Sequence, residues 1–257
     1  MKLETLAQRH AYILKRLQKE ENIRVNDLCD ALGVSSVTIR KDLKLLEDKN
    51  LLFRSHGSIS KINPYTKDVN VREKEQVHLE EKIRIGNFAA TQVEAGEAII
   101  IASGTTVLQM AKAISVQGRL TVLTSAMNVA MALLSPQQDF EVVQLGGIVR
   151  KTSTSVTGHF AETMLENFAC SKLFLGVDGI DIQQGCTTSN MMEARLNKTM
   201  IDSAQKTIVL TDSTKFGRRG FCKICGIHDI DMLITDDGIA DSYAKWLENE
   251  GIELKIA

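Results

Sequence analysis

The chain has 257 residues, of which 44% are hydrophobic, and its formal net charge is −1. This length allows one or two domains with a sizeable core. The sequence has no run of about 18 apolar residues and begins without the apolar segment of a signal peptide, so it predicts a cytoplasmic protein without a membrane span. Residues 1–60 contain 11 basic and 8 acidic residues, a balance of +3 that leaves −4 on the rest. A basic N-terminal segment followed by an acidic remainder is typical of a nucleic-acid-binding module joined to another domain.

The first 60 residues predict three helices followed by a short hairpin. The helices are expected over residues 5–20, 24–34 and 35–50, and the hairpin over residues 51–62. Asn26 or Asp27 is expected to cap the second helix, which stops at Gly33. Ser35 or Ser36 is expected to cap the third helix.

The third helix divides into an apolar and a cationic face. Ile39, Leu43 and Leu46 recur at helical spacing and are expected to face the core. The other face suits the DNA major groove, with the preceding helix completing a helix-turn-helix and the hairpin forming a wing. A solvated charged face is the simpler alternative for the helix alone, but the wing and the spacing outweigh it. Asp42 would be repelled by phosphate and is expected to orient Arg40 or a neighbouring helix. The expected DNA contacts are Ser35, Ser36, Thr38, Arg40, Lys41, Lys44, Arg54 and His56.

Residues 61–82 are polar and are expected to form a linker, partly helical towards its end. From residue 83 to residue 257, β-branched runs alternate with helical segments. The strands are expected at 98–103, 120–124, 141–146, 172–177, 206–211, 231–236 and 252–257, and helices at 126–135, 189–204 and 239–249. This α/β pattern predicts a mostly parallel sheet covered on both faces, with ligands beyond the carboxyl ends of its strands.

The loop after the first of these strands, in "IIIASGTT", has the composition of a phosphate site. Ser103, Gly104, Thr105 and Thr106 precede a helix, whose N-terminus favours an anion. Such residues often serve merely as helix caps, so the loop alone is moderately specific. The ends of other strands add groups that can donate hydrogen bonds to a phosphate, and carboxylates that can accept hydrogen bonds from sugar hydroxyls. They supply the remaining expected contacts: Thr124, Ser125, Gly146, Gly147, Arg150, Lys151, Asp178, Gly179, Thr187, Glu193, Lys198, Asp212 and Lys215.

The chain has five cysteines, and only Cys222 and Cys225 have metal-ligand or redox spacing. A zinc site would normally need a second pair or several histidines, and only His228 is near. The sequence therefore favours reduced thiols, and we expect no metal and no cofactor.

The segment "LGVSSVTIRKDLKLLEDKNLLFRSHGSI" resembles the DNA-binding part of DeoR-type bacterial repressors. Thr38, Arg40 and Asp42 match the family's Thr-x-Arg-x-Asp-Leu core, and Arg54 begins its Arg-x-His-Gly-Gly wing. Ser58 stands where a second glycine is usual, which would alter the wing turn slightly.

Residues 80–240 resemble the sensor domain of the same family, whose fold is similar to ribose-5-phosphate isomerase. "LGGIVRK", "LGVDGID" and "TDSTKFGR" carry the resemblance, and "GTTVLQMAK" is closer to repressors of sugar-alcohol operons. Ala102 replaces an Asp that is usual two residues before the loop glycine, and Thr124-Ser125-Ala126 replaces Thr-Asn-Ser. If that Asp binds a sugar hydroxyl in relatives, its loss would change the preferred sugar or weaken binding.

Two hypotheses follow. The resemblance implies a transcriptional repressor of a carbohydrate or polyol operon, not an enzyme, controlled by a phosphorylated sugar or polyol. Such a repressor would act as a dimer or tetramer on double-stranded operator DNA. The alternative is a sugar-phosphate isomerase-like enzyme fused to a DNA-binding module, in which Asp178, Glu193 and Lys198 would act as acid and base.

Overall fold

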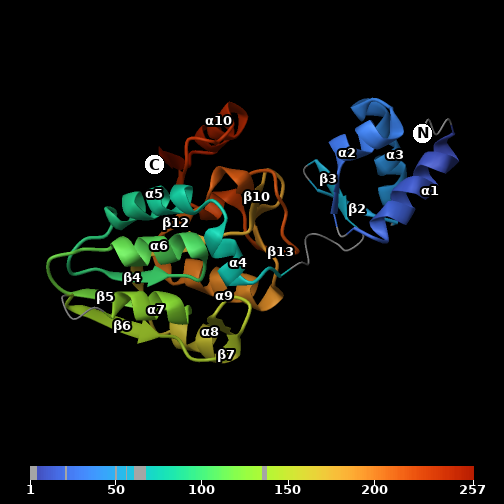
Figure 1. Cartoon of the computed structure of the whole chain (residues 1–257). Coiled ribbons are helices and arrows are strands. Elements are labelled where there is room, and N and C mark those ends of the chain that lie inside the picture. Colours follow the sequence, from blue (N-terminus) through green and yellow to red (C-terminus); the bar gives the residue numbers. More distant parts are fainter. Residues whose placement is uncertain (1–4, 21, 50, 56, 61–67, 135–137) are drawn as a thin grey trace. The chain divides into compact units, whose positions relative to one another are not determined.

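The computed structural model describes residues 5–20, 22–49, 51–55, 57–60, 68–134 and 138–257. It divides the chain into two compact units, Met1–Lys67 and Asp68–Ala257, which are described separately (Figure 1). None of the described helices is both long and apolar enough to cross a bilayer.

The first unit is a winged helix-turn-helix. Its elements are α1 (Leu6–Leu17), β1 (Asn22–Arg24), α2 (Val25–Leu32), α3 (Ser36–Asp48), β2 (Phe53–Ser55) and β3 (Ser58–Ser60). The helices pack around fully buried residues that include Ile13, Leu28, Ile39 and Leu43. The three strands form an antiparallel sheet in the order β1-β3-β2. The expected helices and hairpin are confirmed.

The local signals explain most of the boundaries in this unit. Gly33 has a φ of 64° and ends α2 in the left-handed region that glycine tolerates. Ser35 caps α3, because its hydroxyl accepts a hydrogen bond from the Thr38 amide at 3.3 Å. The expected cap of α2 at Asn26 or Asp27 is wrong. Residues Asn22–Arg24 pair with β3, so the chain passes from strand to helix at Arg24 without a side-chain cap.

The second unit is built on a parallel sheet. Its helices are α4 (Val71–Gln76), α5 (Leu79–Ala90), α6 (Thr105–Ala113), α7 (Met127–Leu133), α8 (His159–Leu165), α9 (Met191–Asp202) and α10 (Asp241–Asn249). Its main strands are β4 (Ala98–Ile101), β5 (Leu120–Thr124), β6 (Phe140–Gln144), β9 (Cys170–Gly176), β12 (Ala204–Leu210), β14 (Met232–Thr235) and β15 (Glu253–Ile256). Within the described residues they run in the order β15-β14-β12-β9-β4-β5-β6, and every neighbouring pair is parallel, which confirms the expected class.

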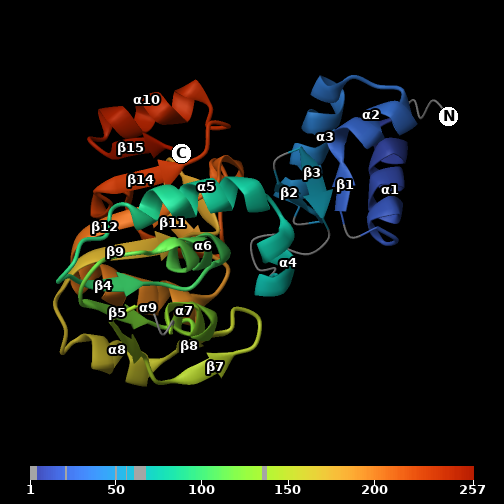
Figure 2. The same ribbon diagram turned by 60° about the vertical axis from the view of Figure 1, so that its left-hand side comes forward.

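Helices cover both faces of this sheet (Figure 2). Successive residues of a strand point to opposite faces. Ile99 and Ile101 of β4 therefore join an apolar cluster with α5, α6 and α7, whereas Ile100 joins a second cluster with α8, α9 and α10. At Gly86 of α5 a Cβ would lie 2.6 Å from the Met110 amide nitrogen. The absent side chain lets α5 and α6 approach closely at this point.

Three features of the second unit differ from expectation. A hairpin of β7 (Ile148–Arg150) and β8 (Ser155–Thr157) follows β6. A small antiparallel sheet joins β10 (Gly179–Asp181), β11 (Gly185–Thr188) and β13 (Cys222–Cys225). Residues 68–82, the described part of the expected linker, contain α4 and the start of α5, which agrees with the helix expected towards its end. They pack on this unit through the buried Val71 and Lys82, so they belong to it and are not a free linker.

Candidate functional sites

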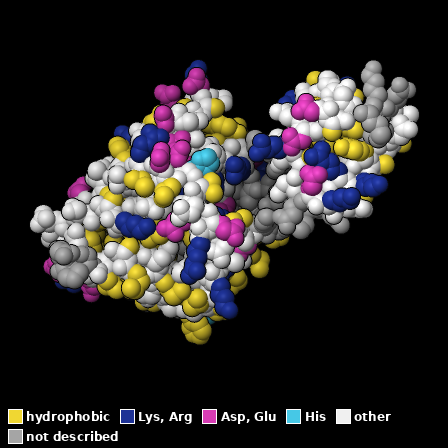
Figure 3. Space-filling model, viewed as in Figure 1, with side chains coloured by type: hydrophobic (Ala, Val, Ile, Leu, Met, Phe, Trp, Pro, Cys, Tyr) yellow, Lys and Arg dark blue, Asp and Glu magenta, His cyan; other side chains and the backbone are white. Residues whose placement is uncertain are grey.

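The outer face of α3 carries unpaired cations. Arg40, Lys41 and Lys44 are exposed, and no described residue forms an ion pair with any of them. Val37 lies on the same face and is 60% exposed. Lys and Arg side chains are visible on this unit in Figure 3. A free cationic helix face after a helix-turn-helix is suited to the phosphates and base edges of duplex DNA.

Asp42 lies on the opposite, buried side of α3. Its carboxylate accepts hydrogen bonds from Nε of Arg9 at 2.6 Å and from a terminal guanidinium nitrogen at 3.1 Å. Of the two roles expected for Asp42, orientation of a neighbouring helix is therefore confirmed, because Arg9 belongs to α1. This pair fixes α1 against α3 and leaves Arg40 available at the surface.

The wing residues have different positions. The Arg54 amide donates to Oε1 of Glu47 at 3.1 Å, and its guanidinium lies 3.5 Å from Oε2. Both the amide and the guanidinium of Arg54 therefore contact Glu47 of α3. His56 lies outside the described residues.

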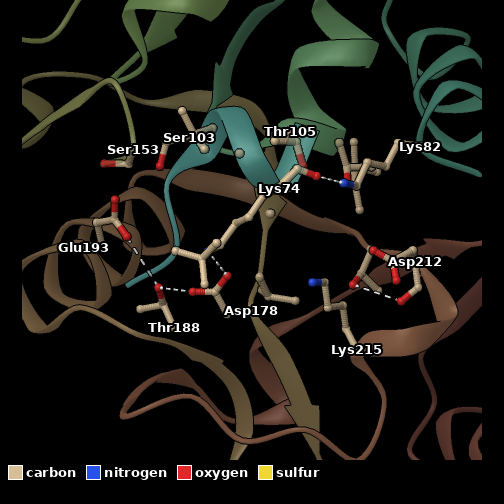
Figure 4. A pocket seen from close by; sticks show the side chains of 18 of the residues that line it. Lys74, Lys82, Ser103, Thr105, Ser153, Asp178, Thr188, Glu193, Asp212 and Lys215 are labelled. Carbon is tan, nitrogen blue, oxygen red and sulfur yellow. Dashed lines mark hydrogen bonds and ion pairs between the residues drawn. The ribbon is translucent and has the colours of Figure 1, made fainter. Parts of the chain in front are cut away.

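The second unit contains a polar pocket at the carboxyl ends of three central strands (Figure 4). Its floor comes from the loops after β4, β9 and β12, and its walls come from residues 68–74, from residues 152–153 and from α9. The enclosed cavity measures about 80 Å³, and the space measures about 740 Å³ when its open mouth is included.

Two buried or partly buried lysines face this pocket without a carboxylate partner among the described residues. Lys82 is only 4% exposed and donates to the backbone carbonyls of Lys74 and Val77. Burial lowers the pKa of Lys82 to about 8. Burial also lowers the pKa of Lys215, in the short helix Ser213–Lys215. Asp212 lies near enough to favour the charged form of both lysines but forms no ion pair with either of them. Buried cations without a direct ion pair favour an anionic ligand, because the anion can supply one.

The N-terminus of α6 lies at the same pocket and adds backbone donors. Gly104 is its N-cap with a φ of 146°, and no side chain caps the helix. The first-turn amides of a helix have no intrahelical acceptors, so they can bind an anion. Thr105 and Thr106 line the pocket beside them.

Carboxylates occupy another part of the pocket. Asp178 forms an ion pair with Lys74 at 2.6 Å and accepts from the Ser189 amide at 3.1 Å. Burial alone would raise the pKa of Asp178, but Lys74 and the other donors hold it below its ordinary value. Glu193 pairs with Arg150 behind the wall. These acceptors suit sugar hydroxyl groups.

The structure brings some of the expected effector residues together and places others elsewhere. The pocket is lined by Ser103, Gly104, Thr105, Thr106, Asp178, Glu193, Asp212 and Lys215. Arg150 supports it from behind through Glu193 and Asp68. The residues that do not line it are Thr124, Ser125, Gly146, Gly147, Lys151, Gly179, Thr187 and Lys198.

Each residue outside the pocket has another role or position. Thr124 and Ser125 are buried at the end of β5, and the Thr124 hydroxyl accepts from the Ala126 amide at 3.1 Å. Thr187 donates to the carbonyl of Gly179 at 3.1 Å within the small sheet. Lys198 pairs at the surface with an aspartate one turn away.

The remaining loop residues are at the surface, where Gly146, Gly147 and Lys151 are exposed. Ala102 is fully buried in the apolar cluster on the α8 and α9 face and does not line the pocket. The described residues contain no group of three or more potential metal ligands, and Cys222 and Cys225 lie in β13.

Asp68, Lys74 and Lys82 are pocket residues that sequence reasoning assigned to a linker. A signal for Lys82 was present, because Lys82, Ile85, Gly86 and Ala89 lie at the spacing of a single helix face and all are buried. A lysine on the buried face of a helix is unfavourable unless polar groups or a ligand compensate its charge. Thr152, Ser153 and Asn197 also line the pocket and were not expected.

A helix-turn-helix with a free cationic helix, joined to a unit with a small-molecule pocket, defines a ligand-responsive DNA-binding regulator. Comparison with known families agrees: residues 9–64 match the DeoR-like helix-turn-helix domain, and residues 77–237 match the DeoR C terminal sensor domain. The chain belongs to the DeoR family of transcriptional regulators.

Relatives cover nearly the whole chain. A protein of Escherichia coli O157:H7 named for repression of the aga operon is 36% identical over 96% of this chain and 93% of its own length. The regulator YulB of Bacillus subtilis is 35% identical over 97% of this chain and 96% of its own length. The regulator GlpR of Haloferax volcanii is 31% identical, with 96% coverage of both chains.

Solved structures give only distant similarities. Ribose 5-phosphate isomerase A from Methanocaldococcus jannaschii aligns with a TM-score of 0.38 and 14% identity, over 52% of this chain and 53% of the isomerase. The β subunit of eIF2B from Chaetomium thermophilum aligns with a TM-score of 0.42 and 12% identity, over 60% of this chain and 48% of that subunit.

Proposed function

We propose that this protein is a transcriptional repressor of a carbohydrate or polyol operon, and that a phosphorylated sugar or polyol controls its affinity for operator DNA. The observation that carries the proposal is the pair Lys82 and Lys215, which line the pocket near the N-terminus of α6 and form no direct ion pair with a described residue.

The two ends of such a ligand fit different parts of the pocket. Its phosphate would bind near Lys82, Lys215 and the first amides of α6. Its hydroxyl groups would bind to the carboxylate groups of Asp178 and Glu193, which are hydrogen-bond acceptors. This division of charge favours a ligand that is both anionic and polyhydroxylated over a simple anion or a neutral sugar.

The DNA-binding side of the proposal depends on α3. Arg40, Lys41 and Lys44 would contact the phosphates and base edges of one operator half-site, assisted by Ser35, Ser36 and Thr38 at the start of the helix. A homo-oligomer held through its second units would present two such helices to a pseudo-palindromic operator. Among the relatives, one is named a repressor of the aga operon and another a lactose phosphotransferase system repressor.

The alternative of an isomerase-like enzyme is less well supported. Proton transfer at a sugar carbon needs a base whose pKa is near the working pH, and the pKa of Asp178 is held below its ordinary value. Lys198, the third residue of that hypothesis, does not line the pocket. The relatives described above are named transcriptional regulators or repressors.

A ligand screen tests the proposal directly. Thermal unfolding of the full chain is followed with a panel of phosphorylated sugars and polyols and with the corresponding unphosphorylated compounds. A ligand present at 100 times its Kd should add about 2.7 kcal/mol of stability. Lys215→Met should abolish the shift, whereas Lys223→Met, a change of an exposed lysine in β13, should not.

The same ligand should then change the affinity for an operator fragment selected from a random duplex pool. Stabilisation by none of the phosphorylated compounds, or equal stabilisation of wild type and Lys215→Met, would contradict the proposal. Interconversion of sugar phosphates at more than trace rates would support the enzyme instead.

A further inference from the structure

Residues 68–78, called the connecting segment below, begin the second unit directly after the chain leaves the DNA-binding unit. They include α4 and end at His78, which has a φ of 54°. Four of their side chains, Asp68, Val69, Val71 and Lys74, line the candidate ligand pocket. The first residues of the second unit therefore form a wall of the pocket.

The start of the connecting segment is fixed by a polar anchor. Asp68 accepts a hydrogen bond from the Thr152 hydroxyl at 2.8 Å and pairs with Arg150. Arg150 also pairs with Glu193, a pocket residue. The Val71 amide donates to the Thr152 carbonyl at 2.7 Å, so backbone and side chain hold the segment at one place.

The end of the segment is fixed by two lysines. Lys74 pairs with Asp178 at 2.6 Å. Lys82 donates to the carbonyls of Lys74 and Val77 and thereby satisfies the C-terminal end of α4 (Figure 4). A helix as short as Val71–Gln76 is not stable on its own in water, so its conformation depends on these contacts.

The groups that hold the segment are those that the proposed ligand would use. An anion beside Lys82 and Lys215 competes with the α4 carbonyls for the Lys82 ammonium. The same anion attracts Lys74, and hydroxyl groups on the ligand compete with Lys74 for Asp178. Hydroxyl contacts to Glu193 also disturb its pair with Arg150, and through Arg150 the anchor at Asp68.

We propose that the ligand signals to the DNA-binding unit by rearranging the connecting segment, through Lys74 and Lys82 at its end and through Asp68 at its start. This inference rests on the proposed function of the pocket. A ligand shifts an equilibrium only by binding its two states differently, and these exchangeable contacts supply that difference. Asp68 is the first residue of the second unit, so a change at its anchor is passed directly to the chain that leads to the DNA-binding unit.

Hydrogen–deuterium exchange on the full chain tests the rearrangement, with inorganic phosphate as the probe and chloride at equal ionic strength as the reference. Thermal unfolding in the same buffers measures whether phosphate binds. We expect the exchange rates of the amides at 71–77 to change at least threefold on phosphate binding, while those of α10 stay constant. Stabilisation by phosphate without a change at 71–77 overturns the inference and leaves the proposed function standing. If phosphate neither stabilises the protein nor changes exchange, the inference and the proposed function are both refuted.

An insertion tests the coupling without altering any pocket residue. Gly-Ser-Gly-Ser is inserted between Lys67 and Asp68, and the matched control carries the same insertion after Gly118, in the exposed turn between α6 and β5. Phosphate should stabilise both variants as it does wild type. The effect of phosphate on affinity for the selected operator fragment should fall at least threefold only in the first variant. A first variant that responds as strongly as wild type overturns the inference.

Discussion

Lys82→Met separates ligand binding from stability in a way that tests the interpretation of the pocket. Lys82 is 4% exposed, and no described carboxylate pairs with it. Burial lowers the pKa of Lys82 from 10.5 to about 8, a difference of about 2.5 that corresponds to roughly 3 kcal/mol of unfavourable free energy for the charged form. Methionine removes this penalty while it retains most of the side-chain volume.

The substitution also removes two hydrogen bonds to the carbonyls of Lys74 and Val77, each worth about 1 kcal/mol. The balance predicts that the ligand-free variant is more stable than wild type by about 1 kcal/mol near pH 7. The same variant should bind phosphate at least tenfold more weakly, because a cation facing the anion is lost. A residue retained for structure alone would show the opposite sign of the stability change.

Denaturation followed by the fluorescence of Trp246, the only tryptophan of the chain, measures this change in the second unit. The folded-state pKa of Lys82 lies below its unfolded value, so the penalty is complete below about pH 8. The penalty disappears as the pH rises from about 8 to 10.5. Over that range the free energy of unfolding of wild type should therefore increase relative to that of the variant. A variant destabilised by more than about 2 kcal/mol, or one that binds phosphate normally, would refute the reasoning.

Three further predictions concern both units. Arg40→Ala should weaken operator binding at least tenfold in a gel-shift titration, while Lys49→Ala, beyond the end of α3, should not. Asp42→Ala should destabilise the first unit by about 3 kcal/mol, because it leaves the Arg9 charge without its buried partner; amide exchange in α1 measures this, and unchanged exchange would count against the role assigned to the pair. Phosphate affinity, measured by calorimetry, should be greatest just below pH 8 and fall as the pH rises through 8, because bound phosphate needs Lys82 charged; a flat profile would contradict this.

Periodicity predicted the main elements because each depends on a local signal. The parallel strands are continuous apolar runs such as "AIIIAS", and the helices of the first unit begin and end near residues such as Ser35 and Gly33. The hairpin β7–β8 and the small sheet β10-β11-β13 have no such runs. The pairs β7–β8 and β10–β11 are short local hairpins, whereas β13 joins the small sheet by a pairing between segments distant in the sequence, as where Cys186 lies opposite Cys225.

The pocket was predicted less completely than the elements, because only the loops after neighbouring strands meet at one site. Residues after strand ends were expected to converge, and those of β4, β9 and β12 do, because these strands are neighbours in the sheet. The loop directly after β6 does not line the pocket, because β6 is an edge strand that is separated from β9 by β4 and β5. Strand order, which a single sequence does not reveal, decides which loops meet.

Polarity alone did not distinguish a solvated linker from a segment that packs on a domain. Residues 68–82 are polar, and polarity in a segment between two domains is typical of a solvated linker. Here Asp68 and Lys74 have partners elsewhere in the second unit, and the buried Lys82 donates to the carbonyls of Lys74 and Val77 within the same segment. A segment that only joined two units would have no need for these contacts. Their presence at the point where the chain leaves the ligand-binding unit is the reason to regard the connecting segment as part of the response to ligand.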